Sequence, residues 1–407
     1  MPRTSPPVSR ILAIGDELLL GRTADTNSAW LAQRLVDCGL VPDRLQAIGD
    51  GEDGIVEALY SAAKGVHLVI CTGGLGPTDD DRTRHALARA MDVKLIANAT
   101  AWRHVVNWYA MHRPGKAVPE SNRRQALLPR GCTLLPNTCG TAPGMLGRIG
   151  STWIACLPGV PHEMRAMFDG LVRRLPKLIP GLRVPSVAEV WFTGVGESQA
   201  QEHLGGLLSE QNPMVGITVS ELGHITLRAV GTAAQVRART KQLARAVAAW
   251  RIPEPGLAPS LIAKLTAQRR TITCAESVSG GHAATQLIAV PGASAVVKAS
   301  FVTYADETKA RILGIAPSLI RRHGAVSEPV VRAMALGARR VAHADIAVAT
   351  TGIAGPGGAT ADLPTGTVFI AATDGKRTLV KRTRITGSRQ HVQKRAAAEA
   401  LLLAWQL

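Results

Sequence analysis

The sequence has 407 residues, a formal net charge of +17 at pH 7, 46% hydrophobic residues and only 3% aromatic residues. A chain of this length is too long to fold around a single hydrophobic core, so two or three domains are expected. So few aromatic side chains argue against a single-strand nucleic-acid binder, which stacks bases on rows of rings. The basic residues are scattered through every segment. This scatter argues against a nucleic-acid partner and favours anionic small molecules.

The cysteines and the chain start favour a cytoplasmic protein. The six cysteines form no Cys-x-x-Cys pair, and most stand among apolar residues, so we expect reduced core thiols. No segment approaches the roughly 18 apolar residues of a membrane span, so we expect no membrane partner. Residues 1–9 lack the apolar core of a signal peptide and are expected to form a flexible leader.

The first part of the chain alternates strand-like and helix-like segments, which is typical of a mostly parallel sheet with helices on both faces. Asn27 or Ser28 is expected to cap the first helix. The expected strands are residues 10–14, 41–48 and 67–71, and the expected helices are residues 30–38, 54–63 and 82–90.

Glycine-rich and acidic loops follow these strands, where ligands of open α/β sheets bind. Glycines allow the backbone to approach a phosphate, and neighbouring carboxylates can hold a divalent cation that bridges phosphate oxygens. The alternative is that the glycines only form turns and the acids only favour helix starts. The candidate phosphate-binding residues are Gly73, Gly74, Gly76, Thr78, Asn137, Gly140 and Thr141, and the candidate metal ligands are Asp16, Glu17, Asp80 and Asp81.

A proline-rich and basic stretch, residues 176–185, predicts a domain boundary. The segment that follows is expected to be a small α/β unit that acts as a spacer or a dimerisation module. Residues 253–256, Pro-Glu-Pro-Gly, predict a linker to the last domain. Within the small unit the expected strands are residues 188–193, 217–219 and 225–230, and the expected helices are residues 197–208 and 233–250.

The stretch Ala275 to Gly281, Ala-Glu-Ser-Val-Ser-Gly-Gly, lies between an expected strand, residues 271–274, and an expected helix, residues 282–288. A serine at such a turn can be held exposed beside backbone N–H groups that favour developing negative charge. Ser277 is therefore the candidate nucleophile. The alternative is a serine that caps the helix, followed by glycines required for packing.

Residues downstream of Ser277 could supply the remaining groups of an active site. No convincing His and Asp partners accompany Ser277, so a buried Lys309 is the candidate base and Tyr304 the residue that orients it or relays the proton. The alternatives are a surface lysine and a strand-end tyrosine. The candidate substrate-binding residues are Glu276, Ser279, Gly280, Gly281, Gly352, Gly355, Gly357 and Arg389.

Several motifs together resemble the CinA (competence/damage-inducible protein A) family. The loops at residues 15–19, 73–81, 137–144 and 157–164 resemble its amino-terminal domain, and the Ala275 stretch resembles its carboxyl-terminal domain. The resemblance implies an α/β protein: a molybdopterin-binding-like doubly wound sheet over residues 10–176, a small α/β unit over 186–252, and an α/β amidase domain over 257–407.

The resemblance also implies two activities. The carboxyl-terminal domain is expected to be a nicotinamide-nucleotide amidase (NMN deamidase), which converts nicotinamide mononucleotide to nicotinic acid mononucleotide and ammonia without a cofactor. The amino-terminal domain is expected to cleave ADP-ribose with a divalent metal. We also expect a homodimer.

The chain departs from the family pattern at two places. Val278-Ser279 stands where Cys-Thr is more common, and Ser300 stands where glycine is more common. The first change keeps a hydroxyl at Ser279. Two other classes stay open: a non-catalytic nucleic-acid-associated protein and a molybdopterin-binding protein.

Overall fold

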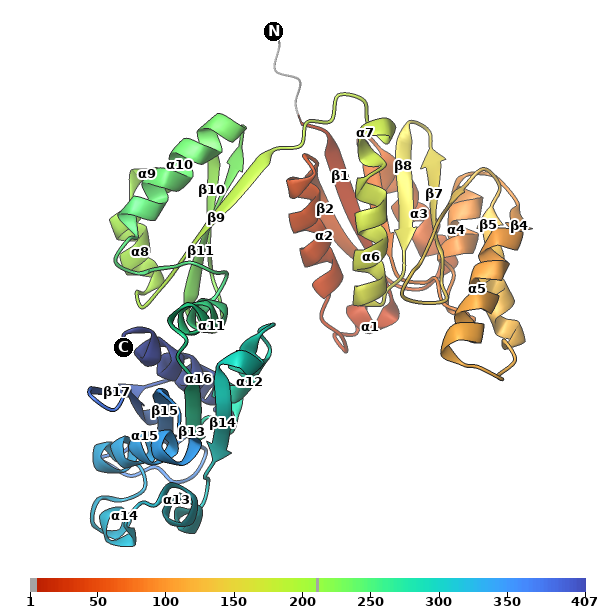
Figure 1. Cartoon of the computed structure of the whole chain (residues 1–407). Coiled ribbons are helices and arrows are strands. Elements are labelled where there is room, and N and C mark those ends of the chain that lie inside the picture. Colours follow the sequence, from red (N-terminus) through yellow and green to blue (C-terminus); the bar gives the residue numbers. More distant parts are fainter. Residues whose placement is uncertain (1–5, 210–211) are drawn as a thin grey trace. The chain divides into compact units, whose positions relative to one another are not determined.

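The computed structural model describes residues 6–209 and 212–407, which divide into two compact units at Ser186 and Val187 (Figure 1). Residues 1–5 of the expected leader lie outside the described residues. The rest of that leader needs a correction, because strand β1 begins at Val8 rather than at Arg10. Val8 and Ser9 pair in parallel with Val41 and Pro42, which places them in the sheet.

The first unit is built on a mixed sheet with strand order β2-β1-β3-β8-β7-β6. Strands β2, β1, β3 and β8 are parallel, whereas β7 and β6 are each antiparallel to the neighbour before them. All five residues of β3 are buried, as expected for a parallel strand covered on both faces. The strands in this order are Val41–Ile48, Val8–Ile14, Leu68–Thr72, Thr152–Leu157, Gly144–Ile149 and Thr133–Leu135.

Helices cover both faces of this sheet because successive residues of each strand point to opposite sides. Ile11 lies in one core with α2 (Thr26–Asp37) and α6 (Pro161–Val172). Leu12 lies in the other core with α3 (Glu52–Ala63) and α4 (Thr83–Ala90) (Figure 1). The short helix α7 (Leu175–Leu178) adds Leu175 to the core that contains Ile11, whereas the short helix α1 (Asp16–Leu19) has no buried residue.

The predicted cap of α2 is wrong. Asp25 is the N-cap, and its carboxylate accepts a hydrogen bond from the amide of Ser28 at 2.9 Å. Asn27 cannot serve, because its side-chain amide donates to the Thr72 hydroxyl at 3.1 Å and to the Gly159 carbonyl at 2.8 Å.

A small lobe between α4 and β6 was not anticipated from the sequence. It contains a two-stranded antiparallel sheet, a helix and a 3₁₀ helix, and its own small core includes Ala101, Ala126 and Leu128. Its elements are β4 (Leu95–Ala97), α5 (Ala99–His112), the 3₁₀ helix Glu120–Ala126 and β5 (Leu127–Pro129).

The second unit contains the expected small α/β domain, with strand order β10-β11-β9-β12. The predicted helix 197–208 is divided, because Gly205 has a φ of 44° and ends α8 (Glu197–Leu204) before α9 (Gly206–Ser209). The predicted helix 233–250 is too long: α10 ends at Ala246, and the chain then pairs with β9 through a short strand. The strands are Met214–Val219, His224–Gly231, Ser186–Thr193 and Arg251–Ile252, and α10 is Ala233–Ala246.

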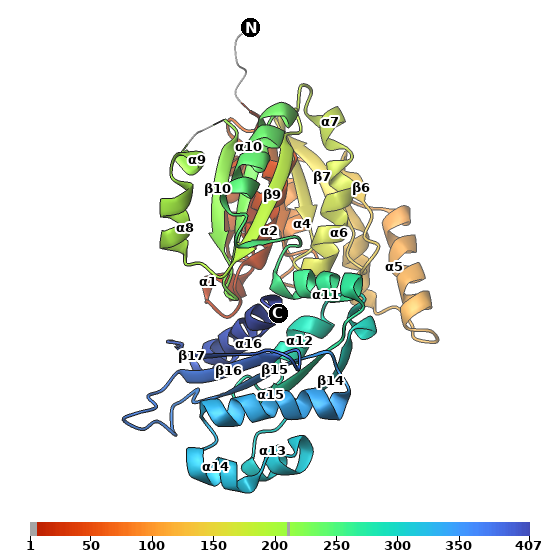
Figure 2. The same cartoon turned by 60° about the vertical axis from the view of Figure 1, so that its left-hand side comes forward.

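The carboxyl-terminal domain has a sheet with strand order β14-β13-β15-β16-β17. One core on this sheet includes residues of α11, α12 and α16, and the other includes residues of α13, α14 and α15 (Figure 2). The strands are Val297–Val302, Ile272–Glu276, Ile346–Gly352, Thr367–Thr373 and Thr378–Arg384. The helices are Leu257–Gln268, His282–Ile288, Asp306–Leu313, Pro317–His323, Glu328–Ala342 and Arg389–Trp405, with a 3₁₀ helix at Ala293–Ala295.

The α/β fold class predicted from the sequence is therefore confirmed. Among the described residues, no helix is both long and apolar enough to cross a membrane.

Candidate active sites

The chain segments predicted to form the carboxyl-terminal site meet at one edge of its sheet. Strands β14, β13 and β15 are parallel neighbours, and β17 runs in the same direction because β16 is antiparallel to both β15 and β17. Their carboxyl ends therefore share an edge. Ser277 follows β13, Tyr304 follows β14, the loop 352–358 follows β15, and Arg389 follows β17.

The backbone position and the hydroxyl of Ser277 are suitable for a nucleophile. Its amide donates a hydrogen bond of 3.0 Å to the Thr350 carbonyl, which fixes the backbone to β15. The residue is 8% exposed, and within the described residues its hydroxyl has no hydrogen-bond partner. Ser277 does not cap the next helix, because Gly281, with a φ of 97°, is the N-cap of α12.

The buried carboxylate of Glu276 stabilises the turn that follows β13 by accepting hydrogen bonds. It is 1% exposed, and its carboxylate accepts hydrogen bonds from two serine hydroxyls and from the amides of residues 281, 283 and 284. A carboxylate at a helix N-terminus satisfies amides that would otherwise lack partners. Because protein groups supply these donors, we assign Glu276 a positioning role instead of the expected contact with substrate.

The two serines at which the chain departs from the family pattern both bind this carboxylate. Ser279 donates to Glu276 at 2.8 Å and shares a hydrogen bond of 2.6 Å with the Thr350 hydroxyl. Ser300 donates to Glu276 at 3.2 Å. Ser279 is fully buried, so its expected contact with substrate is also replaced here by an internal contact.

Lys309 and Tyr304 are linked, but not in the expected way. The Lys309 amine donates to the backbone carbonyl of Tyr304 at 2.9 Å and lies 3.4 Å from the Asp306 carboxylate. The surface-lysine alternative is wrong, because Lys309 is 1% exposed. Within the described residues no hydrogen bond joins Lys309 to Ser277.

Arg389 is held beside the loop that follows β15. Its guanidinium donates to the Gly355 carbonyl at 2.6 Å and to the Tyr304 hydroxyl at 3.1 Å. The glycines of this loop differ in their surroundings. A Cβ at Gly352 would lie 2.6 Å from the Thr367 carbonyl oxygen, whereas a Cβ at Gly357 would meet no atom within 4 Å.

The sequence analysis missed Thr303 in this region. Thr303 is fully buried, its amide donates to the Glu276 carbonyl at 2.9 Å, and its hydroxyl has no partner in the described part of the chain. Because Glu276 pairs with Val302 between β13 and β14, Thr303 is the residue beside Ser277 at the ends of these two strands. A hydroxyl at the end of a predicted strand, one residue before Tyr304, was the available signal.

The predicted amino-terminal loops also meet at one sheet edge. Parallel strands β1, β3 and β8 end there, and the loop between β6 and β7 reaches the same edge. A cleft of about 440 Å³ opens between these loops. The expected residues that line it are Glu17, Gly73, Gly74, Gly76, Asp80, Asp81 and Thr141, whereas Asp16, Thr78, Asn137 and Gly140 are not among its described lining residues.

The described charged residues that line this cleft are all acidic. Five carboxylates line it, and no described Lys or Arg residue does. Asp50 and Glu163 were not among the site residues predicted from the sequence. The available signals were the glycines on both sides of Asp50, directly after the strand 41–48, and the position of Glu163 in the loop 157–164. Burial raises the pKa of Asp50, and the negative charges of Asp16, Glu17 and Asp80 act in the same direction.

Asp81 shapes the glycine-rich loop. Its carboxylate accepts from the Gly76 amide at 2.6 Å and from the Thr78 amide at 2.8 Å. Below the loop, Arg84 is buried and donates to the Leu75 carbonyl at 2.7 Å, and this burial lowers its pKa to about 10. A Cβ at Gly73, where φ is 112°, would lie 2.1 Å from a backbone carbonyl oxygen, so this residue must be glycine.

Asn137 positions the neighbouring loop from inside. It is fully buried, and its amide nitrogen donates to the Ala142 carbonyl at 2.9 Å and to Glu163 at 2.6 Å. A Cβ at Gly140 would lie 2.2 Å from the Glu163 carboxyl group, so Gly140 also serves this close packing.

The four expected metal ligands do not form a ready coordination set. Asp16 and Asp50 exchange backbone-to-carboxylate hydrogen bonds of 3.0 and 3.1 Å, and Asp81 is used by its own loop. In the described ranges no group of three or more His, Cys, Asp or Glu residues is arranged to hold a metal ion.

Comparison with known proteins identifies the family. Residues 10–178 match the family model described as "Probable molybdopterin binding domain", and residues 255–407 match "CinA C-terminal domain". A CinA-like protein from Synechococcus sp. (strain CC9902) is 37% identical over 412 residues, which cover 96% of each chain. The chain belongs to the CinA family.

A second relative of similar length supports this assignment. A CinA-like protein from Geobacter metallireducens is 38% identical, with 96% of this chain and 97% of that protein covered. A crystal structure of a competence-damaged protein (CinA) superfamily protein from Escherichia coli is 34% identical, covering 37% of this chain and 87% of that chain with a TM-score of 0.36. The family predicted from the loop motifs is thus confirmed, and these CinA names state no activity.

Proposed function

We propose that the carboxyl-terminal domain hydrolyses the carboxamide of nicotinamide mononucleotide, giving nicotinic acid mononucleotide and ammonia. The observation that carries this proposal is the Ser277 hydroxyl, which lies at a strand-to-helix turn and has no hydrogen-bond partner in the part of the chain that the structure describes. Neighbouring polar side chains on the same strand ends, such as Ser279 and Thr351, are engaged by protein groups. Ser277 is thus available for a substrate.

In the proposed reaction, the Ser277 oxygen attacks the amide carbon and forms a covalent acyl-enzyme as ammonia leaves. Lys309 in its uncharged amine form, assisted by Tyr304, takes the serine proton and returns it to the leaving nitrogen. Water then cleaves the ester and restores Ser277. The missing hydrogen bond between Ser277 and Lys309 does not argue against this role, because catalytic hydrogen bonds often tighten only when substrate binds.

Binding of the substrate would use the loop after β15 and the start of α16. Backbone amides of residues 352–358 are proposed to stabilise the oxyanion. Arg389 is proposed to hold the 5′-phosphate, since a guanidinium and a helix N-terminus both favour anions. Its contacts with Gly355 and Tyr304 support this role because they hold the guanidinium between these two loops.

The test measures release of ammonia and nicotinic acid mononucleotide from nicotinamide mononucleotide, without added metal. Ser277→Ala and Lys309→Met are expected to lose activity while remaining folded by circular dichroism, and methionine preserves the packing of the buried lysine stem. Ser294→Ala is the matched control, because it removes an exposed serine hydroxyl of the same domain that makes no described contact with the Ser277 turn. Full activity in folded Ser277→Ala would contradict the mechanism.

For the amino-terminal domain we propose metal-dependent cleavage of ADP-ribose. The observation that supports it is the cleft with five carboxylates and no described basic lining residue. A free diphosphate would be repelled there, whereas a diphosphate that carries a divalent cation would be attracted. The glycine-rich loop leaves room for phosphate groups to approach the backbone.

Glu17, Asp50 and Asp80 are the residues proposed to contact the cation. Carboxylate oxygens suit Mg²⁺ or Mn²⁺, but the substrate's phosphate oxygens would have to complete the coordination, since no described triad holds a metal alone. A bound divalent cation would supply charge neutralisation at the phosphates.

The test compares ADP-ribose hydrolysis with Mg²⁺, Mn²⁺ and no metal in the parent and in Asp50→Asn. We expect metal-dependent activity that Asp50→Asn reduces and that Ser277→Ala leaves unchanged. Purified protein that carries a pterin cofactor and does not cleave ADP-ribose would instead support the molybdopterin-binding alternative.

A further inference from the structure

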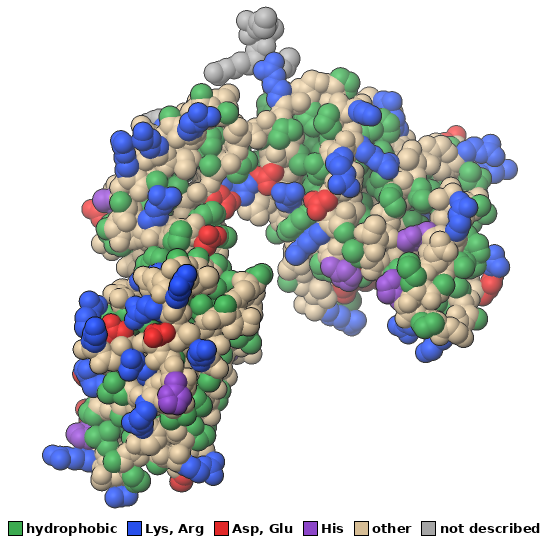
Figure 3. Space-filling view, in the orientation of Figure 1, with side chains coloured by type: hydrophobic (Ala, Val, Ile, Leu, Met, Phe, Trp, Pro, Cys, Tyr) green, Lys and Arg blue, Asp and Glu red, His purple; other side chains and the backbone are tan. Residues whose placement is uncertain are grey.

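The small domain of the second unit carries a groove of about 620 Å³ between α10 and strands β9 and β12. Four basic residues line it: Arg237, Lys241 and Arg245 from α10, and Arg251 from β12. Figure 3 shows Lys and Arg side chains gathered over this helix. The other lining residues are alanines and a threonine, so the floor of the groove is formed by small side chains.

The basic residues of α10 share one side of the helix because they are four positions apart. At about 1.5 Å of rise per residue, neighbouring cations are about 6 Å apart along the helix axis. Arg239, at a different helical position, is buried instead. Residues 233–251 contain no Asp or Glu that could neutralise the groove.

These four cations are exposed and have no partner among residues 6–209 and 212–407. Within the described residues, no ion pair or side-chain hydrogen bond engages Arg237, Lys241, Arg245 or Arg251. By contrast, Arg228 of the same domain pairs with Glu189 at 2.9 Å. Four unpaired like charges around one groove repel each other, so an occupant with several negative charges would relieve this repulsion.

We propose that this groove binds the phosphate backbone of double-stranded nucleic acid, independently of base sequence. The repeat of cations along α10 is of the same order as the distance between phosphates on a strand, and Arg251 offers a contact from the other wall. No described aromatic side chain lines the groove, so bases of a single strand would find no stacking partner there. Contacts would be restricted to phosphates, which fix affinity but not sequence.

The experiment measures binding of the whole protein to a fluorescein-labelled duplex of about 20 base pairs at several NaCl concentrations. Four phosphate contacts predict that log K falls with log[NaCl] with a slope of about −3.6. The groove variant R237Q/K241Q/R245Q is expected to bind at least about tenfold more weakly at low salt, with a slope that is smaller by about 3. Glutamine preserves helix propensity, so α10 should stay folded.

The matched control is K298Q/R321Q/R322Q, which removes the same residue types and charge from exposed positions of the carboxyl-terminal domain. It should bind the duplex within about twofold of the parent at low salt. Equal losses in both variants would overturn the groove assignment and leave only a net-charge effect. Tighter binding to a single strand, or equal competition by polyglutamate, would overturn the assignment to duplex phosphates. Retained nicotinamide mononucleotide cleavage in the groove variant would support a separate site.

Discussion

Arg389 donates a hydrogen bond of 3.1 Å to the Tyr304 hydroxyl, although 85 positions separate the two residues in the sequence. The same guanidinium donates to the Gly355 carbonyl at 2.6 Å. One side chain at the start of α16 thus joins the loops that follow β14 and β15. Tyr304 is 62% exposed, so this contact, and not burial, orients its ring.

Tyr304→Phe removes the only hydroxyl in this link and should lower deamidation of nicotinamide mononucleotide. If Tyr304 assists proton transfer, kcat should fall by about 100-fold, because general acid–base contributions are typically of that order or larger. Stability should change by less than about 0.5 kcal/mol, since the side chain is exposed. Steady-state kinetics and urea unfolding would test both expectations.

Arg389→Lys is the companion variant. It keeps a positive charge but loses the planar pair of donors, so KM should rise more than kcat falls. Unchanged KM and kcat in both variants would remove Tyr304 and Arg389 from the proposed site.

Glu276→Gln should destabilise the carboxyl-terminal domain strongly. The buried carboxylate accepts five hydrogen bonds, and an amide group replaces one acceptor atom by a donor facing other donors. We expect a loss of about 3 kcal/mol in the free energy of unfolding. Ser300→Ala removes a single donor from the same carboxylate and should cost about 1 kcal/mol.

Urea unfolding followed by a probe in the carboxyl-terminal domain would measure both losses. If Glu276→Gln proved as mild as Ser300→Ala, the carboxylate would not be holding the turn.

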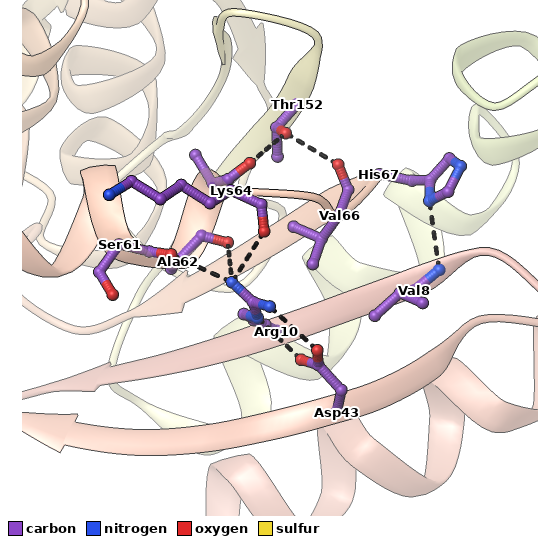
Figure 4. Close-up of polar contacts among 10 residues, drawn as sticks. Val8, Arg10, Asp43, Ser61, Ala62, Lys64, Val66, His67 and Thr152 are labelled. Carbon is purple, nitrogen blue, oxygen red and sulfur yellow. Dashed lines mark hydrogen bonds and ion pairs between the residues drawn. The ribbon is translucent and has the colours of Figure 1, made fainter.

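An ion pair in the first unit should make its stability depend on acid pH. Arg10 donates to Asp43 at 2.8 and 3.0 Å, and its remaining nitrogen donates to carbonyls at the end of α3 (Figure 4). The hydrogen bond from Arg10 lowers the pKa of Asp43 in the folded protein. The stabilisation is therefore complete above the unfolded pKa of about 3.9 and disappears as pH falls through the folded pKa.

Asp43→Asn should thus cost no more than about 1 kcal/mol at pH 7, because the pair is partly exposed and screened. The difference from the parent should shrink as pH falls below about 4. Arg10→Met should cost more at pH 7, since it also leaves the helix-end carbonyls without their donor. A loss for Asp43→Asn that is equal at pH 7 and pH 3 would contradict this account.

Alkylation should distinguish Cys139 from Cys132. Cys139 is exposed in the loop between β6 and β7, whereas burial raises the pKa of Cys132 to about 12. At pH 8 the reactive thiolate of Cys132 is therefore scarce. We expect iodoacetamide to modify Cys139 first, as mass spectrometry of peptides would show.

Cys139→Ser should abolish this first, rapid modification by iodoacetamide. Equal modification rates for Cys132 and Cys139 in the parent would mean that the half-buried Cys132 thiol is as accessible and reactive as Cys139.

Local sequence patterns predicted much of the fold. The helix 282–288 and the strand 41–48 were predicted with the bounds that the structure has, because the residue types and turns that define them are adjacent in the chain. The predicted end of α8 was wrong because the helix stops at Gly205, a local break signal that was overlooked. The predicted end of α10 was wrong because the short strand β12 depends on pairing with β9.

The candidate sites show the same division. Ser277 and the glycine-rich loops were found from the sequence, since a turn between a strand and a helix has a local signature. The internal roles of Glu276 and Asn137 had no such signature. Each depends on which loops meet at a sheet edge.

The sequence by itself determined the α/β class, the family and the turns that present Ser277 and the glycine-rich loop, because these follow from short-range residue patterns. Only the tertiary structure decided which polar side chains lie together at a site and which are hydrogen-bonded to other groups of the protein. Strand order sets those distances, because it brings Arg389 to Tyr304. In the groove of the small domain, the spacing of four along α10 is already visible in the sequence, and the tertiary structure adds Arg251 of β12 to the same groove.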